Sequence, residues 1–205
     1  MKQLTTRLLY DYWNDVRGDR LAPTRFEIEP ARMSTVLSET FILERTLREG
    51  FPFRLAGTRI CEQFGRELRG SDFLSLIGSD HRAISLALSA VTNAGAALLL
   101  EIEAETADSR TAQFEALVLP LKHPAEEVTR YLGTISAMDP EPWLGFEPLE
   151  RSWLIRHNLI WPDGCPDALT TNLDRRLPFS PELAAARIVR SDRRQFRILD
   201  GGRKE

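Results

Sequence analysis

Residues 97–122, ALLLEIEAETADSRTAQFEALVLPLK, decide the fold class. The first half alternates between apolar and acidic residues, which is the period-2 pattern of a strand with one buried face. Its apolar positions are Leu98, Leu100, Ile102 and Ala104, and its acidic positions are Glu101, Glu103 and Glu105. A turn at residues 106–110 leads to a second alternating run, in which Pro120 indicates a position near the strand end or at a sheet edge. The stretch therefore predicts two strands joined by a turn.

Further strands lie on both sides of this stretch. Residues 128–138, VTRYLGTISAM, predict a third strand after a short loop. On the N-terminal side, residues 38–45 and residues 51–57 are two short apolar runs separated by turn residues, so we expect a hairpin there. The chain therefore offers five strands for one antiparallel sheet.

Helical segments separate the hairpin from the three later strands. Residues 58–77 contain short helical pieces punctuated by Gly65 and Gly70. Residues 80–95 predict a longer helix with Ser79 as its N-cap. This order of elements predicts an α+β domain over residues 35–139, a five-stranded antiparallel sheet with short helices on one face.

An N-terminal helical extension, residues 1–34, precedes this domain. Residues 4–17 carry apolar side chains at helical spacing, with Thr5 or Thr6 as the N-cap and Gly18 as the end of the helix. The helix is amphipathic and its apolar side is wide. That side either docks on its own domain or forms the seam of a dimer.

A C-terminal extension, residues 140–205, follows a boundary rich in turn formers at residues 139–145 and is partly irregular. Within it, residues 151–161 are apolar enough to pack, and we expect a short helix. Near the end of the chain, Arg190 and Arg194 have a spacing that suits phosphate, because paired guanidinium groups bind phosphate oxygens in a bidentate manner. A solvated basic tail is the alternative to an anion site.

The composition argues against several classes of protein. The chain has 205 residues and a net charge of −3, so no overall positive field favours nucleic acid or an anionic membrane. No apolar run approaches the roughly 20 residues of a membrane span, and the N-terminus lacks the apolar core of a signal peptide. Its two cysteines, Cys61 and Cys165, form no disulfide framework. We therefore expect a cytoplasmic protein.

Two longer segments point to a family. Residues 10–33, YDYWNDVRGDRLAPTRFEIEPARM, and residues 53–76, FRLAGTRICEQFGRELRGSDFLSL, resemble small stand-alone PAS proteins of alphaproteobacteria, some of which are linked to motility and cell-cycle signalling. The resemblance covers residues 8–139. It implies a PAS-like fold and a sensory or protein-interaction role, and it implies no reaction.

The resemblance also bears on cofactors. Light-sensing PAS domains hold flavin beside a cysteine in a G-R-N-C-type motif, and the matching stretch here is Gly65-Arg66-Glu67-Leu68, with leucine in place of cysteine. Haem-binding members take a histidine from the connecting helix, where His81 stands at the exposed start. Flavin–thiol photochemistry and haem are therefore not expected, and the cofactor is left unknown.

No catalytic or metal-binding pattern stands out. Three scattered histidines and two cysteines lack metal-ligand spacing, and the motifs of serine hydrolases and P-loop proteins are absent. Cys61 lies near Arg59 and Arg66 in the sequence, but a free cysteine is more often a small buried apolar residue. We predict a protein that is not an enzyme and has no metal site.

Two sets of residues remain as candidate binding positions. The residues expected to converge between sheet and helices either fill that space or line a cavity for a small apolar ligand; they are Phe53, Leu55, Phe64, Ile84, Leu88, Ile102 and Phe114. The candidate contacts with a second copy or another signalling protein are Leu8, Leu9, Trp13, Glu101 and Glu103. The sequence thus predicts a PAS signalling module that forms a homodimer and acts through protein contacts, with a sensor of an apolar ligand as the alternative.

Overall fold

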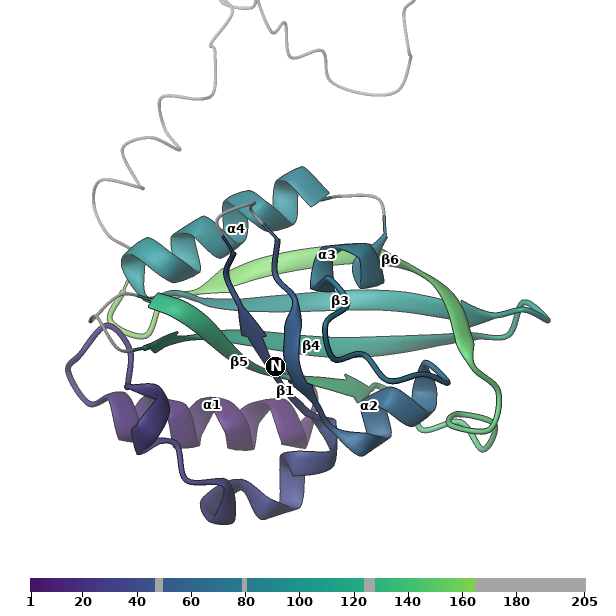
Figure 1. The fold of residues 1–205 in the computed structure, drawn as a ribbon, viewed down its shortest axis with the longest axis horizontal. Coiled ribbons are helices and arrows are strands. Elements are labelled where there is room, and N and C mark those ends of the chain that lie inside the picture. The colour runs from purple at the N-terminus through teal and green to yellow at the C-terminus, as the bar shows by residue number, and fades with distance from the viewer. Residues whose placement is uncertain (47–49, 79–80, 124–127, 165–205) are drawn as a thin grey trace, which may run out of the picture. The chain divides into compact units, whose positions relative to one another are not determined.

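The fold is a single antiparallel sheet with helices on both faces (Figure 1). The structure, a computed structural model, describes residues 1–46, 50–78, 81–123 and 128–164. The strands are β1 Thr40–Glu44, β2 Phe53–Ala56, β3 Ala97–Thr106, β4 Thr111–Lys122, β5 Val128–Ala137 and β6 Leu149–Ile160. The helices are α1 Leu4–Arg17, η1 Arg25–Glu27, η2 Pro30–Glu39, α2 Thr58–Gln63, α3 Phe73–Ile77 and α4 His81–Ala94, where η1 and η2 are 3-10 helices. The predicted positions Ser79, Cys165, Arg190 and Arg194 lie outside the described residues.

The strand order is β2-β1-β5-β4-β3-β6, and all pairs are antiparallel. The α+β class, the hairpin and the three later strands are therefore confirmed. The described sheet has six strands where the sequence predicts five, because residues 149–160 pair with β3 along nearly its whole length. The prediction of a short helix at residues 151–161 is wrong, and the sheet continues past residue 139.

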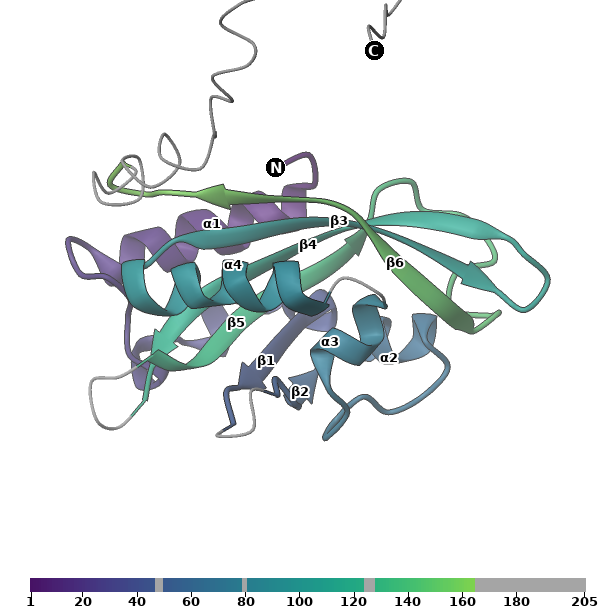
Figure 2. The same ribbon diagram turned by 90° about the horizontal axis from the view of Figure 1, so that it is seen from above.

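The helices divide between the two faces of the sheet. Figure 2 shows α2, α3 and α4 on one face, the inner face of the fold, and α1 on the opposite, outer face. The predicted N-terminal helix ends as expected at Gly18, whose φ of 56° lies in the left-handed region that favours glycine. The predicted arrangement of an N-terminal helix followed by a sheet with short helices is confirmed.

The N-terminal helix docks on the sheet of its own chain. Leu9 and Trp13 are fully buried, and the Trp13 indole Nε1 donates a hydrogen bond of 2.9 Å to the Pro120 carbonyl oxygen. β4 lies inside the sheet, so Pro120 is near the end of its strand and not at a sheet edge. Pairing with β3 stops at Val118, and therefore the missing N–H of Pro120 faces no β3 partner.

The core between the sheet and the inner helices is built from aromatic rings. Phe41, Phe53 and Phe73 contact one another with ring centroids 5.5–5.8 Å apart, and each ring is almost fully buried. Such edge-to-face and tilted pairs add roughly 0.5–1.5 kcal/mol beyond the area they bury. The centre of the inner face is therefore occupied by side chains that lock β1, β2 and α3 together.

Candidate functional site

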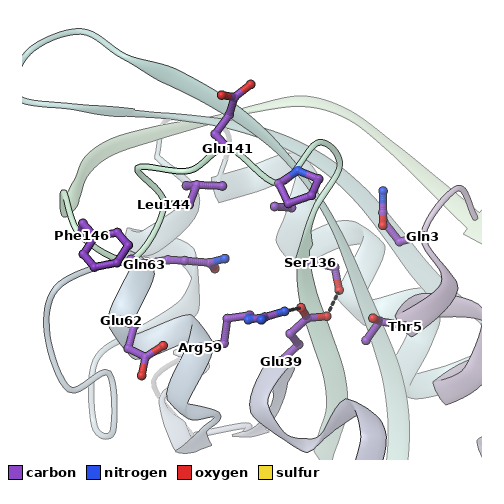
Figure 3. Close-up of a pocket in the computed structure, with 13 residues that line it drawn as sticks. Gln3, Thr5, Glu39, Arg59, Glu62, Gln63, Ser136, Glu141, Leu144 and Phe146 are labelled. Atoms are coloured by element: carbon purple, nitrogen blue, oxygen red, sulfur yellow. Dashed lines mark hydrogen bonds and ion pairs between the residues drawn. The ribbon is translucent and has the colours of Figure 1, made fainter.

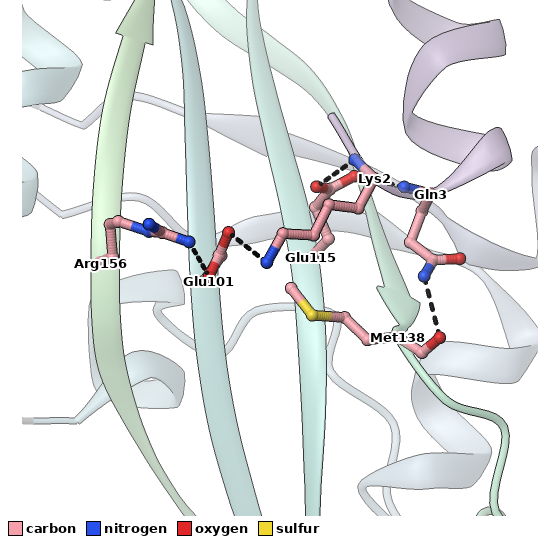
Figure 4. Close-up of polar contacts among 6 residues, drawn as sticks. All are labelled: Lys2, Gln3, Glu101, Glu115, Met138 and Arg156. Carbon is pink, nitrogen blue, oxygen red and sulfur yellow. Dashed lines mark hydrogen bonds and ion pairs between the residues drawn. The ribbon is translucent and has the colours of Figure 1, made fainter.

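Two carboxylates lie side by side on the outer face of the sheet. Glu101 on β3 and Glu115 on β4 are directly opposite in the strand register, and their exposed fractions are 8% and 0%. Like charges in such a cross-strand pair repel each other, so both need compensation. Figure 4 shows that the start of the chain supplies much of it.

The N-terminal segment holds both carboxylates. The backbone N–H groups of Lys2 and Gln3 donate to the Glu115 carboxylate at 2.7 and 2.9 Å, and the Gln3 side chain donates to the Met138 carbonyl oxygen. Glu115 therefore pairs the N–H of the N-cap residue Gln3 and that of Lys2 before it, and it lies near the positive end of the helix dipole. The sequence-based prediction of Thr5 or Thr6 as the N-cap is wrong, since the N-cap is Gln3 and both threonines lie inside the helix.

Two cations neutralise the second carboxylate. Lys2 Nζ lies 3.1 Å from Glu101 Oε1, and Arg156 of β6 donates to Glu101 Oε2 at 2.6 Å. The hydrogen bond from Arg156 lowers the pKa of Glu101 most, burial opposes it, and Lys2 lowers it further. Glu101 thus ties the N-terminus and the last strand to β3.

Beyond Glu101 the outer face is open. Glu103 pairs in register with Trp153 and Glu105 with Arg151, and the four side chains are exposed or half-buried. A bulge between the pairs made by Glu101 and Ile102 leaves Ile155 without a partner, and this isoleucine is 46% exposed. Within the described residues β6 ends the sheet, so its second edge pairs with no strand.

The candidate contact residues of the first helix fall into two groups. Leu8 is 44% exposed, and with Tyr12, Met33 and Val36 it lines a shallow pocket between α1 and η2. Leu9 and Trp13 are instead buried against the sheet of their own chain. Of the three, only Leu8 is therefore available to a partner without movement of α1.

Most of the predicted cavity residues are buried together in the core. The buried members are Phe53, Phe64, Ile84, Leu88, Ile102 and Phe114. Leu55 departs from this pattern, because it lies on the short edge strand β2 and is 46% exposed. Leu88 also borders a pocket of about 240 Å³. Phe51, just before β2, and Thr92 of α4 line the same pocket. The expectation that these residues hold a ligand stays a prediction.

A larger pocket lies elsewhere, at the end of the sheet where α2, η2 and the loop after β5 meet. Its volume is about 690 Å³, which falls in the range of small-molecule sites. Figure 3 shows its side chains, which come from α2, η2, β5, the start of α1 and residues 140–146. Gly57 allows α2 to begin close to η2, since a Cβ there would lie 2.3 Å from the Ser38 carbonyl oxygen.

One wall of this pocket is a charged network. Glu39, at the end of η2, accepts hydrogen bonds from Ser136 of β5 at 2.7 Å and from Arg59 of α2 at 2.9 Å. Burial raises the pKa of Glu39, but the hydrogen bonds from Ser136, Arg59 and Thr5 outweigh burial and hold this pKa below its usual value. Glu39 is therefore ionised at neutral pH and has its partners in place.

Gln63 stands on the same helix as Arg59 and points toward the middle of the pocket (Figure 3). Its residue surface is only 4% exposed, and its Oε1 is buried with no hydrogen-bond partner among the described residues. Sequence reasoning missed Gln63 and Glu39. The available signal was the polar character of TRICEQ at residues 58–63, which is unusual for a short helix whose other side enters the core.

The remaining candidate groups for chemistry stay apart. Cys61 is half-buried, and its Sγ lies 3.8 Å from Glu67 Oε1 and 4.0 Å from the Ala56 carbonyl oxygen. Leu68, which stands where the flavin-binding motif has cysteine, is fully buried in the core. His81 is exposed at the start of α4. No group of three or more His, Cys, Asp or Glu side chains that could hold a metal ion occurs in the part of the chain that the structure describes.

A family match identifies the class of this chain, and the similar solved structures are distant. The model of the PAS domain family matches residues 1–136, so the chain belongs to that family. Among solved structures, a Rhodobacter sphaeroides LOV protein is 15% identical, with a TM-score of 0.41, and the alignment covers 51% of this chain and 61% of that one. No curated protein sequence matches the chain.

Two further solved structures are similar to the chain at a comparably low identity. The LOV domain of a blue-light activated histidine kinase from Erythrobacter litoralis is 18% identical with a TM-score of 0.39, and 50% of this chain and 96% of that one are covered. The PAS domain of an HTR-like protein from Haloarcula marismortui is 17% identical with a TM-score of 0.40, covering 55% and 94%. The Rhodobacter sphaeroides protein is matched over less than two thirds of its length. Across residues 1–46, 50–78, 81–123 and 128–164, no helix has the length and apolar character to cross a membrane.

Proposed function

We propose that this chain is a PAS signalling module that is not an enzyme and acts in the cytoplasm through protein–protein contacts, first of all with a second copy of itself. The sequence elements at residues 10–33 and 53–76 support placing it with the alphaproteobacterial stand-alone PAS proteins linked to motility and cell-cycle signalling. Membership of the PAS domain family supports a sensory role. The proposed contact surface is the outer face of the sheet together with β6.

The observation that carries the proposal is the outer edge of β6, which pairs with no strand within residues 1–46, 50–78, 81–123 and 128–164. A long strand with a free edge presents a row of backbone N–H and C=O groups that a second strand satisfies by pairing. β6 has 12 residues, and its bulged Ile155 is exposed beside the half-buried Trp153. Two copies that pair β6 with β6 in antiparallel fashion form one continuous sheet with two-fold symmetry.

The same surface connects a partner to the N-terminal helix. Arg156 of β6 bonds to Glu101, and Glu101 in turn bonds to Lys2 just before α1. A shift of β6 on association therefore alters the neutralisation of the two adjacent carboxylates. In this proposal α1 is the element that moves, and its exposed residue Leu8 contacts the next signalling protein.

Sedimentation velocity of the full-length chain over a range of concentrations tests the proposal. We expect a dimer in the unmodified chain and at least about tenfold weaker association for Ile155→Asp, because a carboxylate would be buried in the paired edge. Leu86→Asp is the matched control, since Leu86 is 63% exposed on α4, on the other face of the sheet. A chain that stays monomeric, or two variants that behave alike, would contradict the proposal.

A further inference from the structure

The pocket beside η2 and α2 contains a polar group that the fold leaves unsatisfied. Gln63 is more than nine-tenths buried, and its Oε1 accepts no hydrogen bond within the described residues. Leaving an amide oxygen buried and unpaired costs about 1–3 kcal/mol, and buried polar groups in native proteins are usually paired. The amide end of the side chain points toward the middle of the pocket, so a rotation of the amide presents Oε1 to a donor that enters from the pocket (Figure 3).

The charges that line the pocket indicate what kind of donor enters. Among the described residues, its lining contains the carboxylates of Glu39, Glu62 and Glu141 but the single cation Arg59. Arg59 is paired with Glu39 at 2.9 Å, which leaves Glu62 and Glu141 as exposed carboxylates at the rim. The pocket therefore has an excess of negative charge and attracts cations.

The opposite wall is apolar. Phe146 is 87% exposed, and with Leu144 and Pro140 it comes from the loop after β5. An exposed aromatic ring beside carboxylates is a suitable surface for an organic cation, which gains from both cation–π attraction and apolar contact. A metal ion would gain no binding energy from these apolar side chains.

From these three observations we propose that the pocket binds a small organic amine, whose ammonium group donates to Gln63 Oε1 and whose apolar part packs on Leu144 and Phe146. This site is separate from the aromatic core and from the free edge of β6. It therefore does not depend on the proposed dimer. The amine would contact α2 and residues 140–146 at once, and so its binding would fix the relative positions of these two segments.

Titration with 2-phenylethylamine, followed by protein NMR, tests the site. As a small fragment the amine is expected to bind with Kd on the order of 1 mM and to shift the side-chain amide signal of Gln63. The uncharged analogue of the same shape, 2-phenylethanol, is expected to bind at least about fivefold more weakly, because it lacks the charge that the rim carboxylates attract.

Gln63→Leu removes the acceptor while keeping a similar volume, and we expect it to weaken amine binding about tenfold, the loss of one charge-assisted hydrogen bond. Gln113→Leu is the matched control, because Gln113 is exposed on β4 and does not line the pocket. Glu141→Gln keeps Gln63 intact and should weaken binding a few-fold and reduce its salt dependence. The inference is overturned if the amine does not bind, if the alcohol binds equally well, or if Gln63→Leu binds the amine as tightly as the unmodified chain.

Discussion

The outer face of the sheet and the pocket at its end treat buried polar groups in opposite ways. On the outer face, Glu101 and Glu115 lie side by side and receive four polar contacts in total from Lys2, Gln3 and Arg156. In the pocket, the buried amide oxygen of Gln63 receives none within the described residues. The two carboxylates and this amide oxygen are buried to a similar degree, but only the carboxylates have hydrogen-bond or ion-pair partners within the described residues.

This difference distinguishes polar groups that hold the fold together from a polar group that is available to a ligand. A buried charge that is fully paired holds elements together, and its removal weakens the fold. A buried acceptor without a partner makes the fold less stable, so its presence is better explained by something that the fold does not contain. Single substitutions in the two regions test this difference.

The largest effect is expected at the paired carboxylate. Glu115→Ala removes the acceptor of two backbone N–H groups at the start of α1, and we expect the free energy of unfolding to fall by about 2 kcal/mol. Relief of repulsion at Glu101 offsets part of the loss. Urea denaturation of the full chain measures it.

Glu103→Ala is the control for that experiment. Glu103 lies on β3, on the same outer face of the sheet as Glu101 and Glu115, and is half-buried. Its change in stability should stay within about 0.5 kcal/mol. Equal losses in the two variants would show that the paired contacts of Glu115 are not what anchors α1.

A smaller effect should appear at acid pH through Glu39. Its pKa in the folded chain is lower than the usual value of 4.5, so between these two values the unfolded chain binds more protons. The stabilising contribution is complete above about pH 4.5 and is lost as the pH falls through the lowered pKa. In Glu39→Gln the fall of stability with acid should be shallower than in the unmodified chain.

The acid titration has its own control. Glu150→Gln alters an exposed carboxylate on β6 and should leave the pH profile unchanged. Thermal melts at a series of pH values between neutral and strongly acid compare the three proteins. Parallel profiles for Glu39→Gln and the unmodified chain would remove Glu39 from the set of paired buried groups.

The smallest effect, with the opposite sign, is expected at Gln63. Gln63→Leu replaces an unpaired buried amide with an apolar side chain of similar size, so stability without ligand should stay within about 0.5 kcal/mol or rise. The same urea denaturation measures it. A loss as large as that of Glu115→Ala would mean that the Gln63 amide has a structural partner, and the contrast between the two regions would disappear.

Much of the fold could be predicted because several strands alternate between apolar and polar residues, which indicates one buried face. Residues 97–106 alternate, and β3 is the strand that the sequence predicts most directly. β6 was missed for the reverse reason: most of its residues are exposed or half-exposed on both faces, so residues 149–160 carry no period of two. It forms a strand because β3 offers an edge, which is information from another part of the chain.

The sites were harder to predict because they depend on contacts distant in sequence. Glu115 accepts hydrogen bonds from Lys2 and Gln3, more than 100 residues earlier, and local capping signals at Thr5 or Thr6 do not reveal this. The pocket joins Glu39, Gln63 and residues 140–146, whose polar character is unremarkable in each segment alone. Leu55 has the apolar character of a core residue, and only the edge position of β2 exposes it.

The long-range docking of α1 has a consequence for how the chain is made. Trp13 finds its hydrogen-bond acceptor 107 residues later, in β4. At a synthesis rate of roughly 5–20 residues per second, the helix waits several seconds after it leaves the ribosome before its binding surface exists. During that interval the apolar side chains of Leu9 and Trp13 lack the sheet that buries them, so α1 exposes an apolar surface in the nascent chain to which a chaperone can bind.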